Sequence, residues 1–147
     1  MLRKNCVGAL FCVMAAAGLM LSALLIGCAS SPPANVKSVN CEASRIDWEV
    51  AAEAEITDFS CAMGTHELEP SLIYTVSLKN VSNTPQRFRL HISLLDLDKA
   101  VAFRVPAKGK PPVLKPGEEN TVKIPFMKTT KYPAKTMVRV APMSIEE

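Results

Sequence analysis

Side chains in the second half of this chain alternate between apolar and polar with a period of two, and this pattern limits the possible folds most strongly. In the segment 86–95, every second residue is apolar: Phe88, Leu90, Ile92 and Leu94. The residues between them are polar: Arg87, Arg89, His91 and Ser93. A helix would scatter the two sets around its axis, whereas an extended strand places them on opposite faces. The pattern therefore predicts a half-buried β-strand.

The same alternation recurs in other segments, which we expect to be strands of one domain. It is clear in three segments, and shorter or weaker in two more: 72–79, 122–126, 136–140, 100–105 and 56–63. The segment 47–55 instead favours a helix through its alanine and glutamate content. Several short strands at this spacing predict an all-β fold, an antiparallel β-sandwich.

The segments between these strands carry turn-forming residues. We expect turns at 80–85 and 96–99, which contain Asn, Asp or Pro. Pro116 and Gly117 suit the central pair of a type II turn, because glycine tolerates the positive φ of the second position. The segment 106–116, here named the lysine–proline loop, holds four prolines and three lysines. We expect it to be stiff and exposed, with Val113 and Leu114 offering apolar contacts.

The N-terminus has the pattern of an export signal. Arg3 and Lys4 precede an uncharged, largely apolar segment, 6–29. An uncleaved transmembrane anchor is the alternative, since about 20 apolar residues can span a bilayer. At the end of this segment, Leu25-Ile26-Gly27-Cys28 resembles the lipobox of bacterial lipoprotein precursors. The resemblance implies a cleaved signal peptide over residues 1–27 and acyl chains on Cys28.

An acylated Cys28 would divide the rest of the chain into a tether, 28–40, and a domain, 41–147. The tether segment is small, polar and proline-containing, with no apolar period, as in a flexible linker. Several acyl chains, at about 0.8 kcal/mol per buried methylene, anchor a protein stably in a membrane. In lipoproteins of diderm bacteria, aspartate after the acylated cysteine signals retention in the inner membrane. In this chain the residue after Cys28 is Ala29. The resemblance therefore implies that the protein is anchored at the periplasmic face of the outer membrane.

Three short motifs of the domain resemble a known family. Val76-Ser-Leu-Lys-Asn-Val-Ser82 precedes Ile92-Ser-Leu-Leu-Asp96, and Leu114-Lys-Pro-Gly-Glu118 follows both. This layout is similar to the immunoglobulin-like FxLYD pattern and to the YcfL-type small periplasmic lipoproteins. Over roughly residues 55–141, the resemblance implies an immunoglobulin-like fold and an envelope compartment. It implies no catalytic residues.

Cys41 and Cys61 follow Cys28 in the chain. In an oxidising envelope, an isolated pair of cysteines favours a disulfide. Two free, buried thiols are the alternative. A redox or metal site is disfavoured, because the chain has no Cys-x-x-Cys spacing.

The sequence predicts no catalytic, cofactor or metal site. We expect His66 and His91 to be surface histidines, the latter among basic residues that disfavour a metal ion. Ser60 and His66 lack a nucleophile elbow and a third orienting group. Asp96 and Asp98 supply two carboxylates, too few for calcium, and are expected to cap their own turn.

Charge is divided along the chain. Residues 41–69 carry a net charge of −7 and residues 70–145 one of +9, while residues 28–147 carry only +1. The small total does not favour nucleic-acid binding. The basic side chains expected on the outward faces of strands are Lys79, Arg87, Arg89, Lys123, Lys135 and Arg139.

If these strands adjoin, they form a basic surface that docks an anionic envelope component or an acidic protein. For this contact we single out six residues: Arg87, Arg89, Lys123 and Arg139 on strands, and Lys108 and Lys110 in the lysine–proline loop. The alternative is that the acidic first segment pairs across the sheet with the basic strands, each pair contributing little. For the lysine–proline loop, the alternative is a solvated loop that contacts no partner.

The sequence therefore predicts a non-enzymatic, outer-membrane-anchored periplasmic lipoprotein that acts as a protein-interaction or envelope-assembly module. Binding of a small ligand, a glycan or peptidoglycan is the alternative. It requires a concave aromatic cluster, for which the exported part supplies seven residues: Trp48, Phe59, Tyr74, Phe88, Phe103, Phe126 and Tyr132.

Overall fold

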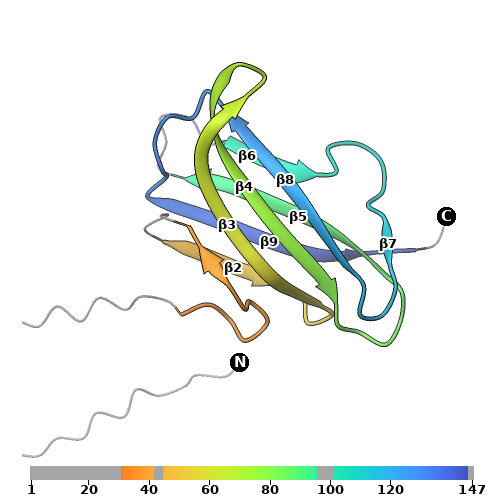
Figure 1. Cartoon of the computed structure of the whole chain (residues 1–147). Coiled ribbons are helices and arrows are strands. Elements are labelled where there is room, and N and C mark those ends of the chain that lie inside the picture. Colours follow the sequence, from red (N-terminus) through yellow and green to blue (C-terminus); the bar gives the residue numbers. More distant parts are fainter. Residues whose placement is uncertain (1–30, 42–44, 96–100, 146–147) are drawn as a thin grey trace, which may run out of the picture.

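All regular elements that the structure describes are β-strands, arranged in two sheets packed face to face (Figure 1). The computed structural model describes residues 31–41, 45–95 and 101–145. The first sheet has the order β1 (Val39–Asn40), β3 (Ala54–His66), β4 (Glu69–Asn80), β8 (Glu119–Met127). The second has the order β2 (Ile46–Val50), β9 (Lys135–Met143), β5 (Gln86–Leu95), β6 (Val101–Val105), and β7 (Val113–Leu114) pairs with β5.

The expected all-β sandwich is confirmed, but its sheets are mixed rather than purely antiparallel. β1 runs parallel to β3, and β2 runs parallel to β9. The other neighbours pair antiparallel. Alternation predicts which side chains are buried but not the direction of the neighbouring strand, so the sequence pattern missed the parallel edges. The arrangement is consistent with an immunoglobulin-like β-sandwich.

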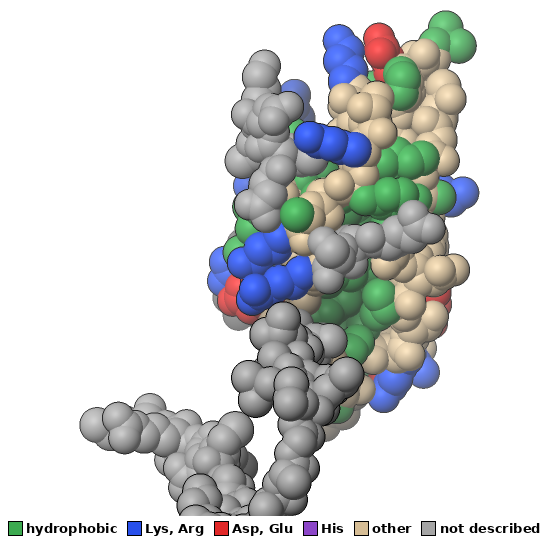
Figure 2. All heavy atoms as spheres, turned by 90° about the vertical axis from the view of Figure 1, so that its left-hand side faces the viewer, with side chains coloured by type: hydrophobic (Ala, Val, Ile, Leu, Met, Phe, Trp, Pro, Cys, Tyr) green, Lys and Arg blue, Asp and Glu red, His purple; other side chains and the backbone are tan. Residues whose placement is uncertain are grey.

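The apolar faces predicted from the alternation meet between the sheets, where they are visible from the side (Figure 2). The buried residues include Leu72, Tyr74, Val76 and Leu78 on β4, and Phe88, Leu90, Ile92 and Leu94 on β5. Neighbouring aromatic rings form a continuous row through the core: Trp48, Phe59, Tyr74, Phe126 and Phe103. The hydroxyls of Tyr74 and Thr136 lie 3.1 Å apart and form a buried hydrogen bond. The core therefore satisfies its deepest polar atoms internally.

The segment 47–55 was expected to be helical, and this prediction was wrong. It forms most of β2, a turn and the start of β3. In β2 the acidic residues Asp47 and Glu49 alternate with apolar ones, and the ring of Trp48 packs against the ring of Phe59. Burial of one face outweighs helix propensities, which differ by only a few tenths of a kcal/mol between such residues.

The domain was expected to begin at residue 41, but the chain already packs on the sandwich before that residue. Val36 is buried and forms a bridge to Ile56 of β3. The side-chain amide of Asn35 donates hydrogen bonds of 3.2–3.4 Å to three carbonyls, those of Val50, Ala51 and Ala54. Residues 35–40 of the expected tether thus pack along the sandwich, whereas residues 28–30 lie outside the described residues.

Turn chemistry is reproduced where the structure describes it. Gly117 has a φ of 78°, and the N–H of Glu118 donates to the carbonyl of Lys115 at 2.9 Å. These are the features of the expected type II turn. The segment 80–85 connects β4 to β5 as expected. The turn expected at 96–99 lies outside the described residues.

The turn between β3 and β4 consists of two residues in an unfavourable, left-handed backbone conformation. Glu67 and Leu68 have φ values of 50° and 67°, as a type I′ turn requires and as Asn-Gly adopts more easily. The side chain of Leu68 is 96% exposed, so burial within this chain does not offset the backbone cost. The hairpin forms the upper end of the molecule in Figure 1.

Replacing this pair by Glu67→Asn with Leu68→Gly is expected to raise the free energy of unfolding by about 1–2 kcal/mol, because the left-handed backbone is no longer strained. Urea unfolding of the full chain in a neutral detergent, followed by the fluorescence of Trp48, measures the change. Leu68→Ala is the matched control. It keeps the unfavourable backbone and should alter the stability by less than about 0.5 kcal/mol. A double variant less stable than the parent would contradict the prediction.

Candidate functional site

The six basic side chains expected on outward strand faces are divided between the two sheets. Lys79 and Lys123 lie on β4 and β8 of the first sheet. The other four lie on β5 and β9 of the second sheet: Arg87, Arg89, Lys135 and Arg139. The expectation that all six side chains form one basic surface is therefore wrong. Lys123 lies on a different sheet from the arginines with which it was grouped.

A compact basic surface does form on the outer side of the second sheet. We name it the arginine face and define it by Arg87, Arg89, His91, Arg104 and Arg139. His91 lies directly opposite Arg104 of β6 on one side and opposite Arg139 of β9 on the other. Arg104 was not among the outward basic residues expected from the sequence, although its position between the apolar Phe103 and Val105 indicated an outward side chain. The alternation within 101–105 places it on the polar face.

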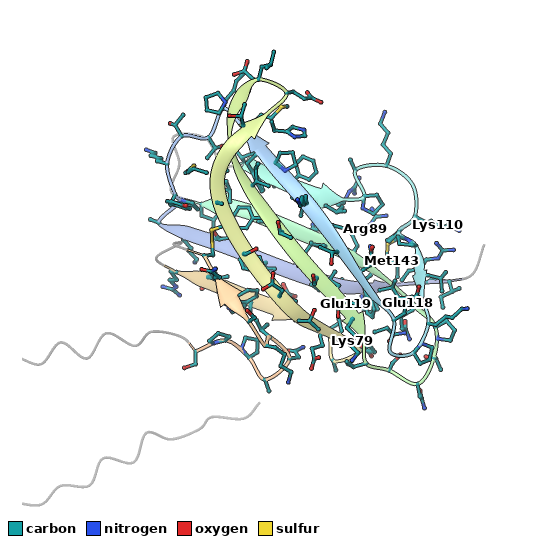
Figure 3. All side chains as sticks on the ribbon, viewed as in Figure 1. Lys79, Arg89, Lys110, Glu118, Glu119 and Met143 are labelled. Atoms are coloured by element: carbon teal, nitrogen blue, oxygen red, sulfur yellow. A yellow bond between two sulfur atoms is a disulfide. The ribbon has the colours of Figure 1, made fainter. Side chains whose placement is uncertain are left out.

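The lysine–proline loop is bound to the arginine face by hydrogen bonds from arginines to main-chain carbonyls. Arg87 Nη1 donates to the carbonyl of Pro111, Arg89 Nη2 to that of Gly109 at 2.9 Å, and Arg104 Nη2 to that of Ala107 at 3.2 Å. Figure 3 shows Arg89 and Lys110 at the same end of the sandwich. The sheet surface and the loop, considered separately in the sequence, are thus one surface.

The loop is less exposed than expected at its second half. Lys108 and Lys110 are exposed, but Pro111 is buried. Val113 and Leu114 form β7 against β5, and Leu114 is 6% exposed. These two residues therefore contribute contacts to the fold rather than apolar contacts for a partner, which corrects the expectation for them.

Two of the basic residues on the second sheet pair with the acidic first segment. Asp47 Oδ2 lies 2.8 Å from Lys135 Nζ, and Glu49 Oε2 lies 3.3 Å from Arg139 Nε. The hydrogen bond from Lys135 lowers the pKa of Asp47 below its ordinary value. Both pairs are partly exposed and contribute little stability. The alternative interpretation of the charge division therefore holds at the β2–β9 edge of the sheet.

At the centre of the arginine face, positive charge outweighs negative charge. The pKa of His91 lies below its ordinary value of 6.5, because partial burial disfavours the imidazolium and because Arg104, Arg139 and Arg89 add positive charge. The folded chain therefore binds this proton less readily than the unfolded chain. The contribution of His91 to stability is fully present above pH 6.5 and is lost as the pH falls from this value through the lower pKa of the folded chain.

A shallow hollow opens beside this histidine. It has a volume of about 250 Å³ and is lined by Arg89, His91, Arg139, Ala141 and Met143. Arg89 Nε donates to Met143 Sδ at 3.1 Å, and Figure 3 shows the two side chains next to each other. The hollow is open to solvent and carries cationic donors from two strands. Its chemistry suits the binding of an anion.

The remaining candidate residues do not form a reactive group in the part of the chain that the structure describes. Cys41 and Cys61 form a disulfide with their Cα atoms 4.7 Å apart. Ser60 and His66 lie six positions apart on β3, which is about 20 Å along a strand. Within residues 31–41, 45–95 and 101–145, no group of three or more His, Cys, Asp or Glu is placed to hold a metal ion. Cys28, Asp96 and Asp98 lie outside these ranges.

Comparison of this chain with protein-family models, curated protein sequences and solved structures finds no match. Among the described residues, no helix is long and apolar enough to cross a membrane. The segment 6–29, which carries the expected export signal, lies outside them.

Proposed function

We propose that this chain is a lipid-anchored envelope protein without catalytic activity, held by acyl chains on Cys28 at the periplasmic face of the outer membrane. The charged start, the uncharged apolar segment and the lipobox-like Leu25-Ile26-Gly27-Cys28 support the anchor. The disulfide between Cys41 and Cys61 supports an oxidising compartment. The sandwich fits the fold implied by the resemblance to FxLYD and YcfL-type domains.

In this proposal the sandwich is a docking module for an anionic envelope component or an acidic protein partner. The observation that carries it is the arginine face, where three arginines are held by loop carbonyls and, within the described residues, not by carboxylates. Side chains that are already ordered lose little entropy on binding. A guanidinium also matches the geometry of carboxylates and phosphates, which it binds with two parallel hydrogen bonds.

Glycan or peptidoglycan binding is the weaker candidate, because the aromatic rings it needs are used in the core. Phe59, Tyr74 and Phe126 are fully or almost fully buried. The rings of Trp48 and Phe103 pack against this group at centroid distances of 4.9 and 5.9 Å. These contacts leave little ring surface on which a sugar could stack.

Reversing charge on the arginine face is expected to abolish partner recovery. We expect Arg89→Glu with Arg104→Glu to reduce at least tenfold the proteins and anionic components that copurify with the tagged full chain after crosslinking in cells. Mass spectrometry of the captured material measures the loss. Lys123→Glu with Lys131→Glu is the matched control, since it makes the same charge change at exposed residues outside the face. Equal losses from both variants would contradict docking at the arginine face.

The same cells test the anchor. With Cys28→Ala, we expect the unprocessed precursor with residue 1 attached, whereas the parent chain should begin at an acylated Cys28. Intact-mass measurement separates the two products. An unacylated, full-length parent chain would remove the support for the proposed location.

A further inference from the structure

We propose that the hollow on the arginine face binds a phosphate monoester carried by a lipid headgroup, with Arg89 and Arg139 as its donors. This inference rests on the proposed docking role of the face and names the chemical group that it recognises. It is carried by the three cationic or ionisable side chains that line one hollow: Arg89, His91 and Arg139.

The pairing register places an arginine directly opposite His91 on each side. Arg104, His91 and Arg139 occupy one row across β6, β5 and β9, and directly opposed side chains have Cβ atoms about 5 Å apart. Arg89 precedes His91 by two residues, so its side chain emerges on the same face. A protonated His91 would carry a like charge directly opposite both arginines, and such opposed like charges destabilise a sheet. An anion bound between them would remove this repulsion.

The charged groups around His91 come from each neighbouring strand. Arg89 lies on β5, Arg104 on β6 and Arg139 on β9, and one carboxylate, that of Glu49 on β2, lies 3.3 Å from Arg139 Nε. This contact occupies the side of Arg139 toward β2. The cationic groups therefore outnumber this carboxylate in the described part of the face.

The arginines are fixed without using all of their donors. Arg89 uses Nε toward Met143 and Nη2 toward Gly109, and Arg104 uses Nη2 toward Ala107. A guanidinium carries five N–H donors, so these bonds hold the groups in place and leave others for a ligand. Two guanidiniums, one from β5 and one from β9, can each donate more than one hydrogen bond, and together they match the three terminal oxygens of a phosphate monoester better than the two of a carboxylate.

The length of the chain before the sandwich favours a lipid as the carrier of the phosphate. Asn35 is fixed on the domain by its side-chain hydrogen bonds. Seven residue steps separate it from Cys28, a span of at most about 25 Å. An anchor at Cys28 would therefore hold the domain near the headgroups, where the effective concentration of lipid phosphate is high.

The two histidines of the chain make the test internally controlled. His91 is the reporter, and His66, on the exposed end of β3, is the control for any general change in surface potential. Proton NMR of the full chain in neutral detergent gives the pKa of each imidazole with sodium phosphate or with sodium chloride at equal ionic strength. Phosphate is expected to raise the pKa of His91 by about one unit and that of His66 by less than about 0.2, because a bound anion favours the imidazolium.

Two further arms establish the donors and the source of the phosphate. We expect Arg89→Gln with Arg139→Gln to abolish the phosphate-induced shift of His91, and Lys123→Gln to keep it. In bicelles of phosphatidylcholine, adding phosphatidic acid should raise the pKa of His91 more than that of His66. Inorganic phosphate acting where phosphatidic acid does not would overturn the lipid source.

Equal shifts of both histidines, or a shift that survives in the double Gln variant, would overturn the site itself. A shift caused by a polyglutamate peptide and not by phosphate would assign the face to acidic proteins and overturn the inference. If partner capture depends on the arginine face while phosphate leaves His91 unchanged, the inference fails and the docking function stands. If phosphate binds while capture is unaffected by charge reversal, the docking function fails.

Discussion

Replacing Asn80 by leucine is expected to lower the free energy of unfolding by about 3–4 kcal/mol, although the two side chains are similar in size. Asn80 is the last residue of β4 and is 0% exposed. Its amide nitrogen donates to the carbonyls of Thr84 and Leu114 at 2.8 and 2.9 Å. Its amide oxygen accepts from the N–H and the hydroxyl of Ser82 at 3.0 and 2.8 Å. Leucine would remove all four bonds and leave the carbonyl of Leu114 and the N–H of Ser82 without these partners.

The backbone of Asn80 increases the importance of this position. Its N–H donates to the carbonyl of Glu118, and its carbonyl accepts from the N–H of Gly117 at 2.8 Å. One residue therefore joins the β4–β5 connection, the end of the lysine–proline loop and the type II turn. Asn80-Val81-Ser82 also has the form of a glycosylation sequon, but its amide is fully occupied by the fold.

Urea unfolding followed by Trp48 fluorescence measures the loss at Asn80. Asn83→Ala is the matched control, because Asn83 belongs to the same connection but is exposed, and it should change the stability by less than about 0.5 kcal/mol. Hydrogen exchange adds a local readout. The N–H groups of β7 should exchange faster in Asn80→Leu than in the parent, relative to those of β5. An Asn80→Leu chain as stable as the parent would show that the hydrogen bonds of Asn80 contribute nothing net.

Where one face of a strand is buried and the other is not, the sequence was sufficient to predict the strand. β4, β5, β8 and β9 were all expected from their alternation, and their apolar residues form the core. β2 was missed because its alternation covers only five residues, and alanine and glutamate follow it closely. The direction of β1 and β2 was not predictable, because a parallel and an antiparallel neighbour bury the same residues.

The candidate site was only partly predictable, for a different physical reason. Outward positions of the arginines follow from the strand period, but the sheet to which each strand belongs does not. This is why Lys123 was grouped with Arg87 and Arg139, which lie on the other sheet. The union of face and loop depends on bonds from arginines to main-chain carbonyls. Every residue has such a carbonyl, so no sequence motif marks the ones that are used.

Removing the disulfide by Cys41→Ser with Cys61→Ser is expected to lower the free energy of unfolding by about 3 kcal/mol and the midpoint of thermal unfolding by roughly 15 °C. The bond joins residues 20 positions apart, and without it the unfolded chain gains the conformations that this loop excluded. Thermal unfolding of the full chain by circular dichroism, compared with the parent in the absence of reductant, measures the effect. Reduced parent chain should behave like the double variant, and reductant should leave the double variant unchanged.

The loss should be concentrated at the start of the sandwich, because the disulfide fixes the end of a very short strand. β1 has two residues, both exposed, and it pairs with β3 at Phe59 and Ser60 beside the bonded Cys61. Two strand residues cannot hold an edge by themselves, so we expect exchange at Val39 and Asn40 to accelerate far more than exchange at Leu90. In an anchored protein, tension on the tether would reach the contacts of Asn35 and Val36 first and then β1. The disulfide passes that tension on to β3, an inner strand of the first sheet. If hydrogen exchange accelerated equally at Val39, Asn40 and Leu90, this local role of the disulfide would be contradicted.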